Sequence, residues 1–412
     1  MPQVRTKTAI LASIKLAAGL ITLSLGLSLV HSPSSSAKPS PSSTLLTPID
    51  PRSVTNQGTN LLGLDAQIFD RQYRNIDYLG DKAALLVAID NSLQYLQTGQ
   101  AITAYRNYPI AGITRDRVQR SLKRFRSLVM TCRSPQELQA AVQREFRYYR
   151  AAGQDNQGTV AFTGYFEPTY QASRVPTAEY RYPLFRLPPN FPQWAKPHPT
   201  RLQLEGADGL QGDKGKLRGL QLVWLRDRLE AFLIHVQGSA RLQLTNGMEM
   251  TVGYAGKTDY AYTGVGRELV KEGKLQLAGL TLPAVVDYFR ATPTEMNRYL
   301  PRNQSFVFFR DTNGAPPTGS LGVPVTAERS IATDKSLMPP GALALISTTI
   351  PTANRRGQLE QTRVSRYVLD QDTGSAIKGA GRVDIFMGTG DQAGDRAGLL
   401  NSTGQLYYLL LK

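Results

Sequence analysis

The hydrophobic periodicity of this 412-residue chain changes near Ala161, and this change limits the folds open to it. Before Ala161, apolar side chains recur every three or four residues, as on one face of an amphipathic helix; Leu86, Ile89 and Leu93 are an example. After it, apolar and polar residues mostly alternate, which is typical of strands. We therefore predict a helical N-terminal region followed by a mainly β remainder.

Three helices are predicted in the N-terminal region, over 83–96, 114–129 and 134–153. The third has Ser134 as N-cap, Pro135 at the first helical position and Glu137 three residues after the cap. We expect it to end near Gly153, because glycine accepts the left-handed conformation that commonly closes a helix.

The β remainder contains two predicted hairpins and one predicted helix. Asn246-Gly247, within RLQLTNGMEMTVGY, is the strongest short-range signal for a two-residue hairpin turn. The segment LQLVWLRDRLEAFLIHV (220–236) is interpreted as a second hairpin that turns at Arg226 to Arg228. The segment TLPAVVDYFRATPTEMNRYL (281–300) predicts a helix that interrupts the strands.

The first residues have the pattern of a secretory signal. Arg5, Lys7 and Lys15 precede an apolar run of about fifteen residues (16–30), which is followed by small polar residues. A bilayer-spanning helix needs ~20 apolar residues, so we predict a cleaved signal over 1–37, with a retained signal anchor as the alternative. No cysteine follows the apolar run, so lipid attachment there is excluded. Residues 38–60, rich in Ser, Pro, Thr and Asn, are predicted to be a linker.

The chain is strongly basic, with a formal net charge of +16 that falls by three, to +13, when residues 1–37 are removed. Such a protein favours a polyanionic partner. The sequence contains no Lys/Arg block and no recognisable nucleic-acid-binding module, so we predict no nucleic-acid partner. A bacterial wall polymer is the other polyanion that would attract an exported basic protein.

Several classes of active site are disfavoured by residue type. One cysteine and three scattered histidines disfavour a metal site, and we predict neither a metal nor a cofactor. The loop GTGDQAG (388–394) lacks the βαβ surroundings of a nucleotide site. The DTGS sequence at 372–375 has no second copy, which a two-lobed aspartic protease would need.

Three aspartates near the C-terminus attract attention as a set: Asp334, Asp372 and Asp384. Asp384 interrupts a short apolar run, between Val383 and Ile385, where a carboxyl group would be rigidly held and partly desolvated. Desolvation raises the pKa of a carboxyl group above its usual value of about 3.9. Taken alone, each of the three is more often a structural residue than a catalytic one.

Seven segments, taken in order, resemble the membrane-bound lytic murein transglycosylase A family. They are FTGYFEPTYQAS, YRYPLFRLP, FLIHVQGSARL, GYAGKTDYAYTGVGR, NQSFVFFR, GSLGVPVTAERSIATDKSLMPPG and GAGRVDIFMGTGDQAGDRAG, spanning 162–398. The last two contain the three aspartates of the family's three-Asp domain. The family name describes lipid-anchored members, whereas this chain has no lipidation cysteine after its apolar run.

The resemblance implies a mainly β fold: a double-psi β-barrel with a second, inserted β-domain, together with the helical N-terminal region. Substrate glycan would lie in a groove between the two β-domains. We place the helical region and the first part of the barrel at 61–171, the inserted domain at 172–320 and the C-terminal three-Asp part of the barrel at 321–412.

The family cleaves the β-1,4 bond between N-acetylmuramic acid and N-acetylglucosamine of peptidoglycan without water. The muramic C6 hydroxyl attacks its own C1 and leaves a 1,6-anhydro ring. Intramolecular attack reaches effective molarities of ~10⁵–10⁸ M, so a second carboxylate is not needed to bring in the nucleophile. One carboxyl group can protonate the leaving oxygen and then accept the C6 hydroxyl proton.

By position in RVDIF, Asp384 matches the family's catalytic acid, and Asp372 and Asp334 are interpreted as supports, with Thr163 lining the groove. The predicted substrate-binding residues are Tyr165, Phe166, Glu167, Gln237, Gly238, Ser239, Tyr254, Arg382, Gly388 and Gly390. The aromatic residues, and Tyr262 with them, suit stacking on sugar faces. Gln237 and Ser239 suit acetamido groups, and Arg382 suits wall carboxylates.

The predicted partner is therefore the peptidoglycan glycan strand, acted on by a monomer exported to the periplasm or cell envelope. That monomer would be either free or peripherally associated with the wall or the outer membrane. Two alternatives stay open at this point. The chain could bind the wall without turnover, or it could be a hydrolytic muramidase that pairs Asp384 with Glu167.

Overall fold

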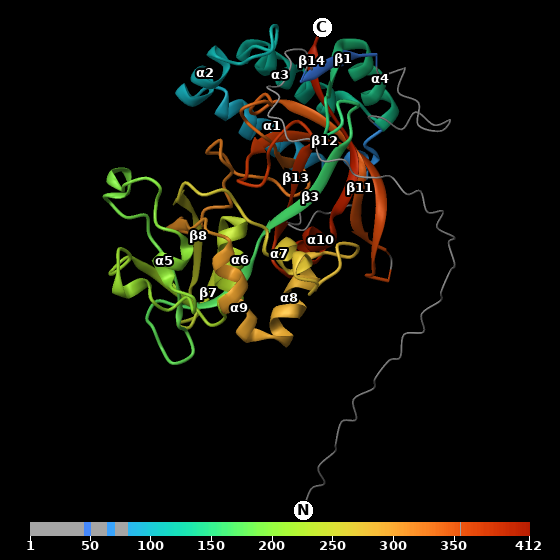
Figure 1. Cartoon of the computed structure of the whole chain (residues 1–412). Helices are drawn as coiled ribbons and strands as arrows, with labels where there is room; N and C mark the ends of the chain where they lie inside the picture. Colours follow the sequence, from blue (N-terminus) through green and yellow to red (C-terminus); the bar gives the residue numbers. More distant parts are fainter. Residues whose placement is uncertain (1–44, 51–63, 71–80, 355) are drawn as a thin grey trace, which may run out of the picture. The chain divides into compact units, whose positions relative to one another are not determined.

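The computed structural model describes residues 45–50, 64–70, 81–354 and 356–412, and the barrel and helices lie within these ranges (Figure 1). The predicted signal over 1–37 and most of the predicted linker lie outside the described residues. Within the linker, however, Leu46–Ile49 form a strand, β1. Among the described residues, no helix combines the length and the apolar character needed to cross a bilayer.

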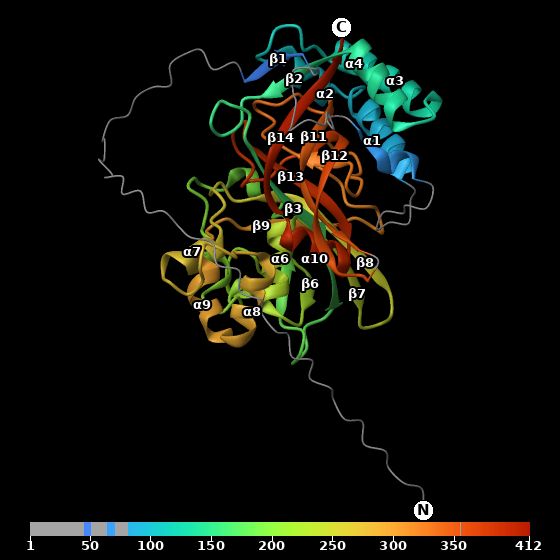
Figure 2. The same cartoon turned by 90° about the vertical axis from the view of Figure 1, so that its right-hand side faces the viewer.

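The helical N-terminal region is confirmed. Its helices are α1 (Asp81–Tyr95), α2 (Gly99–Arg106), α3 (Arg115–Thr131) and α4 (Pro135–Glu145), preceded by the 3-10 turn η2 (Ala66–Phe69). Threonine and serine cap three of the starts, because the hydroxyls of Thr98, Thr114 and Ser134 each accept an N–H from the first turn. Figure 2 shows α1, α3 and α4 packed together beside the barrel strands.

The predicted end of the third helix is wrong. Helix α4 ends at Glu145, and the following Phe146–Ala151 form strand β2, which pairs with β1 on one side and with β14 (Asn401–Leu411) on the other. Phe146, Tyr148 and Tyr149 are buried there. Their burial in the common core makes the strand more favourable than two further helical turns.

Six strands of the described chain close into a barrel. Besides β14 they are β3 (Val160–Glu167), β10 (Ser330–Ala332), β11 (Leu343–Ala353), β12 (Leu359–Asp372) and β13 (Arg382–Thr389). The order is β14-β11-β12-β10-β13-β3, and β3 pairs back to β14. This closed barrel confirms the mainly β fold. The double-psi connectivity that the resemblance implies stays a prediction.

The chain passes from barrel strand β3 directly into a second sheet. Its strands are β4 (Thr169–Ser173), β5 (Tyr182–Phe185), β6 (Gln221–Leu225), β7 (Ser239–Leu244), β8 (Glu249–Lys257) and β9 (Val307–Asp311), in the order β5-β6-β4-β7-β8-β9. The Asn246-Gly247 hairpin is confirmed between β7 and β8, with Gly247 at φ +82° as its tight turn requires. The predicted domain boundaries stay a prediction.

The second predicted hairpin is wrong, because its second half is a helix, α6 (Arg228–Gln237), capped by the Asp227 carboxylate. Ala231 and Ile234 of α6 pack into the core of the second sheet, whereas Phe232 and Leu233 pack against the helices that follow. A helix with apolar contacts on both sides has a continuous apolar sequence, which is also typical of a buried strand.

The remaining helices surround the second sheet and the end of the barrel. They are α5 (Arg201–Glu205), α7 (Val265–Lys271), α8 (Leu282–Ala291), α9 (Met296–Tyr299) and α10 (Asp391–Leu399), with 3-10 turns η3 (Phe191–Gln193), η4 (Gly212–Lys214), η5 (Pro293–Glu295) and η6 (Leu300–Arg302). The helix predicted over 281–300 is confirmed in α8 and α9. Pro293 falls at the 3-10 turn that divides it, and Pro301 falls at the 3-10 turn that follows α9.

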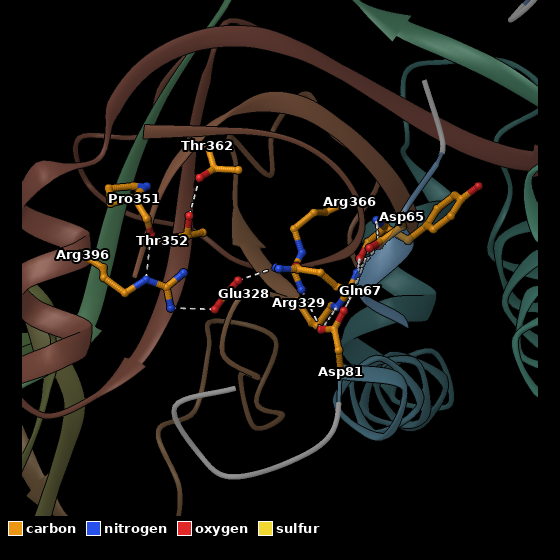
Figure 3. Close-up of polar contacts among 11 residues, drawn as sticks. Asp65, Gln67, Asp81, Glu328, Arg329, Pro351, Thr352, Thr362, Arg366 and Arg396 are labelled. Atoms are coloured by element: carbon orange, nitrogen blue, oxygen red, sulfur yellow. Dashed lines mark hydrogen bonds and ion pairs between the residues drawn. The ribbon is translucent and has the colours of Figure 1, made fainter. Parts of the chain in front are cut away.

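A buried ion-pair network joins the N-terminal region to the barrel (Figure 3). It contains three carboxylates and three guanidinium groups, from Asp65, Asp81, Glu328, Arg329, Arg366 and Arg396. Arg329, fully buried, donates to Asp65 at 2.6 Å and to Asp81 at 3.0 Å. Asp81 also accepts a hydrogen bond of 2.6 Å from Arg366, so the N-terminal carboxylates neutralise the arginines of the barrel.

Candidate active site

The sheet register places the predicted catalytic residues in one row across the barrel. Asp384 on β13 is paired with Thr163 on β3 and, on its other side, with Ala332 on β10. Ala332 is in turn paired with Asp372 on β12. Neighbouring strands are ~4.8 Å apart, so the Cα atoms of Asp372 and Asp384 are separated by roughly 10 Å.

Asp384 is half-buried, and its carboxyl group is held from one side. The Thr163 hydroxyl donates to Oδ1 at 2.8 Å, and the Arg382 guanidinium donates through Nη2 to that hydroxyl at 3.0 Å. Burial raises the pKa of Asp384 to about 6, helped by the Asp372 charge and opposed by the Thr163 hydrogen bond and the Arg382 charge. This carboxyl group is therefore partly protonated near neutral pH, as a general acid must be.

Asp372 is more firmly held than Asp384. Its Oδ1 accepts backbone N–H groups from Ser320 and Thr373, and its Oδ2 accepts the Tyr165 hydroxyl, each at 2.8 Å. Burial still raises its pKa above the usual aspartate value. Asp372 is therefore placed to act on Asp384 through its charge, while its own oxygens are engaged.

Asp334, 6% exposed, caps a turn. Its Oδ1 accepts the backbone N–H and the hydroxyl of Ser336, and its Oδ2 accepts the N–H of Gly379 at 2.9 Å. Burial opposes ionisation of Asp334, but these hydrogen bonds outweigh burial and lower its pKa. This geometry supports a role in holding the loop before β13, without contact to Asp384.

Tyr165 and Phe166 lie beside the row on β3. The Tyr165 ring packs on Phe386 with ring centroids 5.2 Å apart, and its hydroxyl is bound to Asp372. Phe166 is 7% exposed and lies so close to Gly394 of α10 that a Cβ there would meet its ring at 2.8 Å. Phe166 thus fixes α10 against β3, whereas Tyr165 holds Asp372.

Glu167 lies at the junction of the two sheets. Its carboxylate, 1% exposed, accepts the Thr389 hydroxyl at 2.9 Å and lies 3.6 Å from Nε of Arg241 on β7. It is four residues along β3 from Thr163, roughly 13 Å at ~3.3 Å per residue. A pair of glycosidase carboxyls is ~5–9.5 Å apart, so this position does not favour Glu167 as the partner of Asp384.

The predicted acetamido-binding residues lie where α6 meets β7. Gln237 ends α6, and its Oε1 accepts the backbone N–H of Phe166 at 3.1 Å, which leaves its NH₂ group available as a donor. Gly238 closes the helix in the left-handed conformation, and Ser239 begins β7. The structure thus connects these residues to the barrel strand that carries Thr163.

The aromatic candidates differ in exposure. Tyr254 on β8 is 48% exposed, so its ring is open to a ligand. Tyr262 is half-buried, and burial together with the Asp384 charge raises its pKa, which places it near the acid. Gly388 lies near the end of β13, and Gly390 directly precedes α10. Both have positive φ, at +109° and +85°.

Sequence reasoning missed Lys335, which follows Asp334 directly. Its ammonium group donates to the Asp370 carboxylate and to the backbone oxygen of Asp372, and it also contacts Thr333 at 3.1 Å. Its charge lowers the pKa of Asp372, although burial outweighs it. The signal in the sequence that could have identified Lys335 was its position directly after Asp334. No group of three or more metal-ligating side chains occurs among the residues that the structure describes.

Two family models and several known proteins match this chain. The MltA-specific insert domain matches residues 161–310, and the 3D domain matches residues 329–410. The membrane-bound lytic murein transglycosylase A of Escherichia coli K12 is 31% identical over 263 residues, which are 63% of this chain and 68% of that protein. The Vibrio cholerae protein of the same name is 32% identical over the same shares.

The chain belongs to the membrane-bound lytic murein transglycosylase A family. This confirms the resemblance seen in the sequence. Solved structures agree: the lytic murein transglycosylase of Agrobacterium tumefaciens is 26% identical with a TM-score of 0.63, covering 78% of this chain and 92% of that one. The E. coli MltA structure with bound chitohexaose is 27% identical with a TM-score of 0.61, covering 82% and 91%.

The two MltA family models divide the described structure in a simple way. The insert model begins in β3 and ends in β9, so it covers the second sheet. The 3D model covers barrel strands β10 to β14, and it contains Asp334, Asp372 and Asp384. Helices α1–α4 precede both models.

Proposed function

We propose that this protein cleaves the β-1,4 bond between N-acetylmuramic acid and N-acetylglucosamine in peptidoglycan and leaves 1,6-anhydromuramic ends. Its membership of a lytic transglycosylase family supports the class of reaction. The observation that carries the single-acid mechanism is the state of Asp384. This half-buried carboxyl, with a pKa of about 6, is held through Oδ1, while its Oδ2 takes no hydrogen bond from the described residues.

In the proposed reaction, protonated Asp384 gives its proton to the glycosidic oxygen as the bond from C1 of the muramic sugar breaks. The muramic C6 oxygen forms the new bond to C1, and ionised Asp384 accepts the C6 hydroxyl proton. Atoms balance without water, and Asp384 ends in the protonation state in which it began. Asp372 favours protonation of Asp384 through its charge.

Substrate contacts are proposed on the same basis. Tyr254 offers an exposed ring and Tyr165 and Tyr262 lie beside the acid, while Gln237 and Ser239 offer polar groups at the junction of the sheets. The E. coli relative has been solved with chitohexaose, which supports a glycan ligand for this site. We also propose that the protein acts as an exported monomer in the cell envelope, with the three positive charges in 1–37 as part of its signal.

The experiment is mass spectrometry of products released from purified sacculi. A 1,6-anhydro end weighs one water less than a reducing end, so the two outcomes are separated in a single spectrum. Only anhydro ends are expected. Reducing muramic ends from the wild-type protein would make it a hydrolase, and Asp372, two strands from Asp384, would then be the first partner to examine. Binding to sacculi with no product of either kind would instead favour a wall-binding protein without turnover.

A further inference from the structure

The hydrogen-bond chain from Arg382 through Thr163 to Asp384 has a fixed direction. A guanidinium group only donates, so at its 3.0 Å contact with Arg382 the Thr163 oxygen must accept. A hydroxyl has a single proton, and the 2.8 Å contact to Oδ1 of Asp384 is where the structure directs it. If Oδ1 itself carried the acid proton, the Thr163 proton would lose this partner, which is unfavourable in a half-buried site.

The other oxygen of Asp384 is in a different position. Oδ2 accepts no hydrogen bond from the described residues, and it is not among the enclosed polar atoms of the described structure that lack a partner. It is therefore the oxygen of this carboxyl group that lacks a protein donor without being fully enclosed.

We propose that Arg382 and Thr163 act as positioning residues that keep the acid proton of Asp384 on Oδ2, the oxygen open to the glycosidic bond. Thr163 holds Oδ1 as the acceptor, and Arg382 holds Thr163. Arg382 is thereby assigned a role at the acid, since its Nη2 donates to Thr163. This inference rests on the proposed function, because it concerns the proton that the reaction transfers.

The same chain affects how readily Asp384 ionises. A donated hydrogen bond stabilises the carboxylate more than the acid, so the Thr163 contact and the Arg382 charge both lower the pKa of Asp384, against burial and Asp372. The charged or titratable groups that face it are Arg382 on β13, Asp372 on β12, Tyr165 on β3 and Tyr262 before α7. Neither tyrosine ionises near neutral pH, because burial raises the pKa of both.

The test is titration of the Asp384 carboxyl by ¹³C NMR of the full chain with labelled aspartate side chains, with the resonance assigned by its loss in Asp384→Asn. Thr163→Val keeps the side-chain shape but removes the hydroxyl, and we expect the pKa of Asp384 to rise by about one unit or more, because the carboxylate loses a charge-assisted hydrogen bond that the acid form depends on less. Thr163→Ser restores the hydroxyl and should return the titration toward its wild-type midpoint.

Activity gives the second readout. In Thr163→Val the alkaline limb of kcat/KM should move to higher pH, because Asp384 stays protonated longer, and kcat at the optimum should fall several-fold, because the proton can then occupy either oxygen. Arg382→Met should also raise the midpoint. Its effect should shrink in the Thr163→Val background, since part of it passes through Thr163.

An unchanged Asp384 titration in folded Thr163→Val, confirmed by circular dichroism, would overturn the positioning role whatever the activity. If the titration moves as expected while wild-type digests contain only reducing ends, the positioning stands and the proposed function fails. Lower activity in Thr163→Val with neither limb nor titration shifted would show that Thr163 only supports the fold.

Discussion

Two polar clusters of this protein contain the same residue types but differ in how their charges are balanced. The network around Arg329 contains three carboxylates and three guanidinium groups, so its formal charges balance (Figure 3). In the row that contains Asp384 and Asp372, Arg382 is linked to the Asp384 carboxyl group only indirectly. Arg382 donates a hydrogen bond to the Thr163 hydroxyl, which donates in turn to Asp384.

Charge balance is what separates the two clusters. In a balanced buried network each charge is offset by a partner, and removing one member leaves a charge without a partner. At Asp384, where burial is not fully compensated, the pKa is instead raised to about 6, which suits the proposed proton transfer. Substitutions of Asp by Asn in the two clusters should therefore have different consequences.

The largest effect is expected from Asp384→Asn, because the amide can neither give nor accept the required proton. General acid–base catalysis is worth ~10²–10⁴-fold, so turnover of sacculi should fall by at least that factor. The fold should be kept and be slightly more stable above pH 6. The unfolded chain ionises Asp384 at lower pH than the folded chain does, so stability declines as pH rises toward the folded pKa, and the variant escapes this loss.

The control for this prediction is Asp395→Asn, an exposed aspartate on α10 that should keep wild-type turnover. Glu167→Gln should also retain far more activity than Asp384→Asn. Equal losses in Glu167→Gln and Asp384→Asn would revive the two-carboxylate hydrolase.

The next effect is on stability rather than on turnover. Asp81→Asn removes the charge that accepts hydrogen bonds from both Arg329 and Arg366, and we expect a loss of about 3–5 kcal/mol in the free energy of unfolding. Urea denaturation measures it. Asp116→Asn is the matched control, because Asp116 pairs with Arg120 on the surface with its side chain 70% exposed, and such pairs contribute about 0–1 kcal/mol.

A smaller effect is expected from Asp372→Asn. It removes the negative charge that favours protonation of Asp384, while the amide oxygen can still accept the two backbone N–H groups and the amide NH₂ can donate to the Tyr165 hydroxyl. The pKa of Asp384 should fall, and the alkaline limb of kcat/KM should move to lower pH. A limb that stays in place would show that the two aspartates do not interact electrostatically.

No effect is expected from chelation. The described site contains carboxyl, hydroxyl and guanidinium groups, and the proposed acid needs no Lewis-acid help. Activity on sacculi should be the same before and after dialysis against EDTA. Loss of turnover that zinc restores would contradict the acid-only mechanism.

The local parts of this structure were predictable from sequence, and the long-range parts were not. Caps such as Ser134 and the Asn246-Gly247 turn act within a few residues, so sequence predicts them. Helix α6 was mistaken for a hairpin because its apolar contacts lie on two sides, and the end of α4 was missed because β2 depends on pairing with β14.

In the candidate site, too, local features were predictable from the sequence and long-range contacts were not. The position of Asp384 in an apolar run indicated a desolvated carboxyl, as its raised pKa now supports. The pairing of Arg382 with Thr163 could not be read from sequence, because the two are 219 residues apart. Nor could the partners of Asp65 and Asp81, which lie 248 to 302 residues away.

The closed barrel also has a consequence for the order in which the chain acquires activity during synthesis. Thr163 and Asp384 are separated by 221 residues, and β3 gains its second barrel neighbour only when β14, at Asn401–Leu411, is present. Pairing between strands so far apart in the sequence is slow to form, because a long segment must lose conformational entropy before the pairing contacts stabilise it. A nascent chain therefore carries Thr163 long before Asp384 is made, and the proposed site can form only after β13 and β14 have both been added.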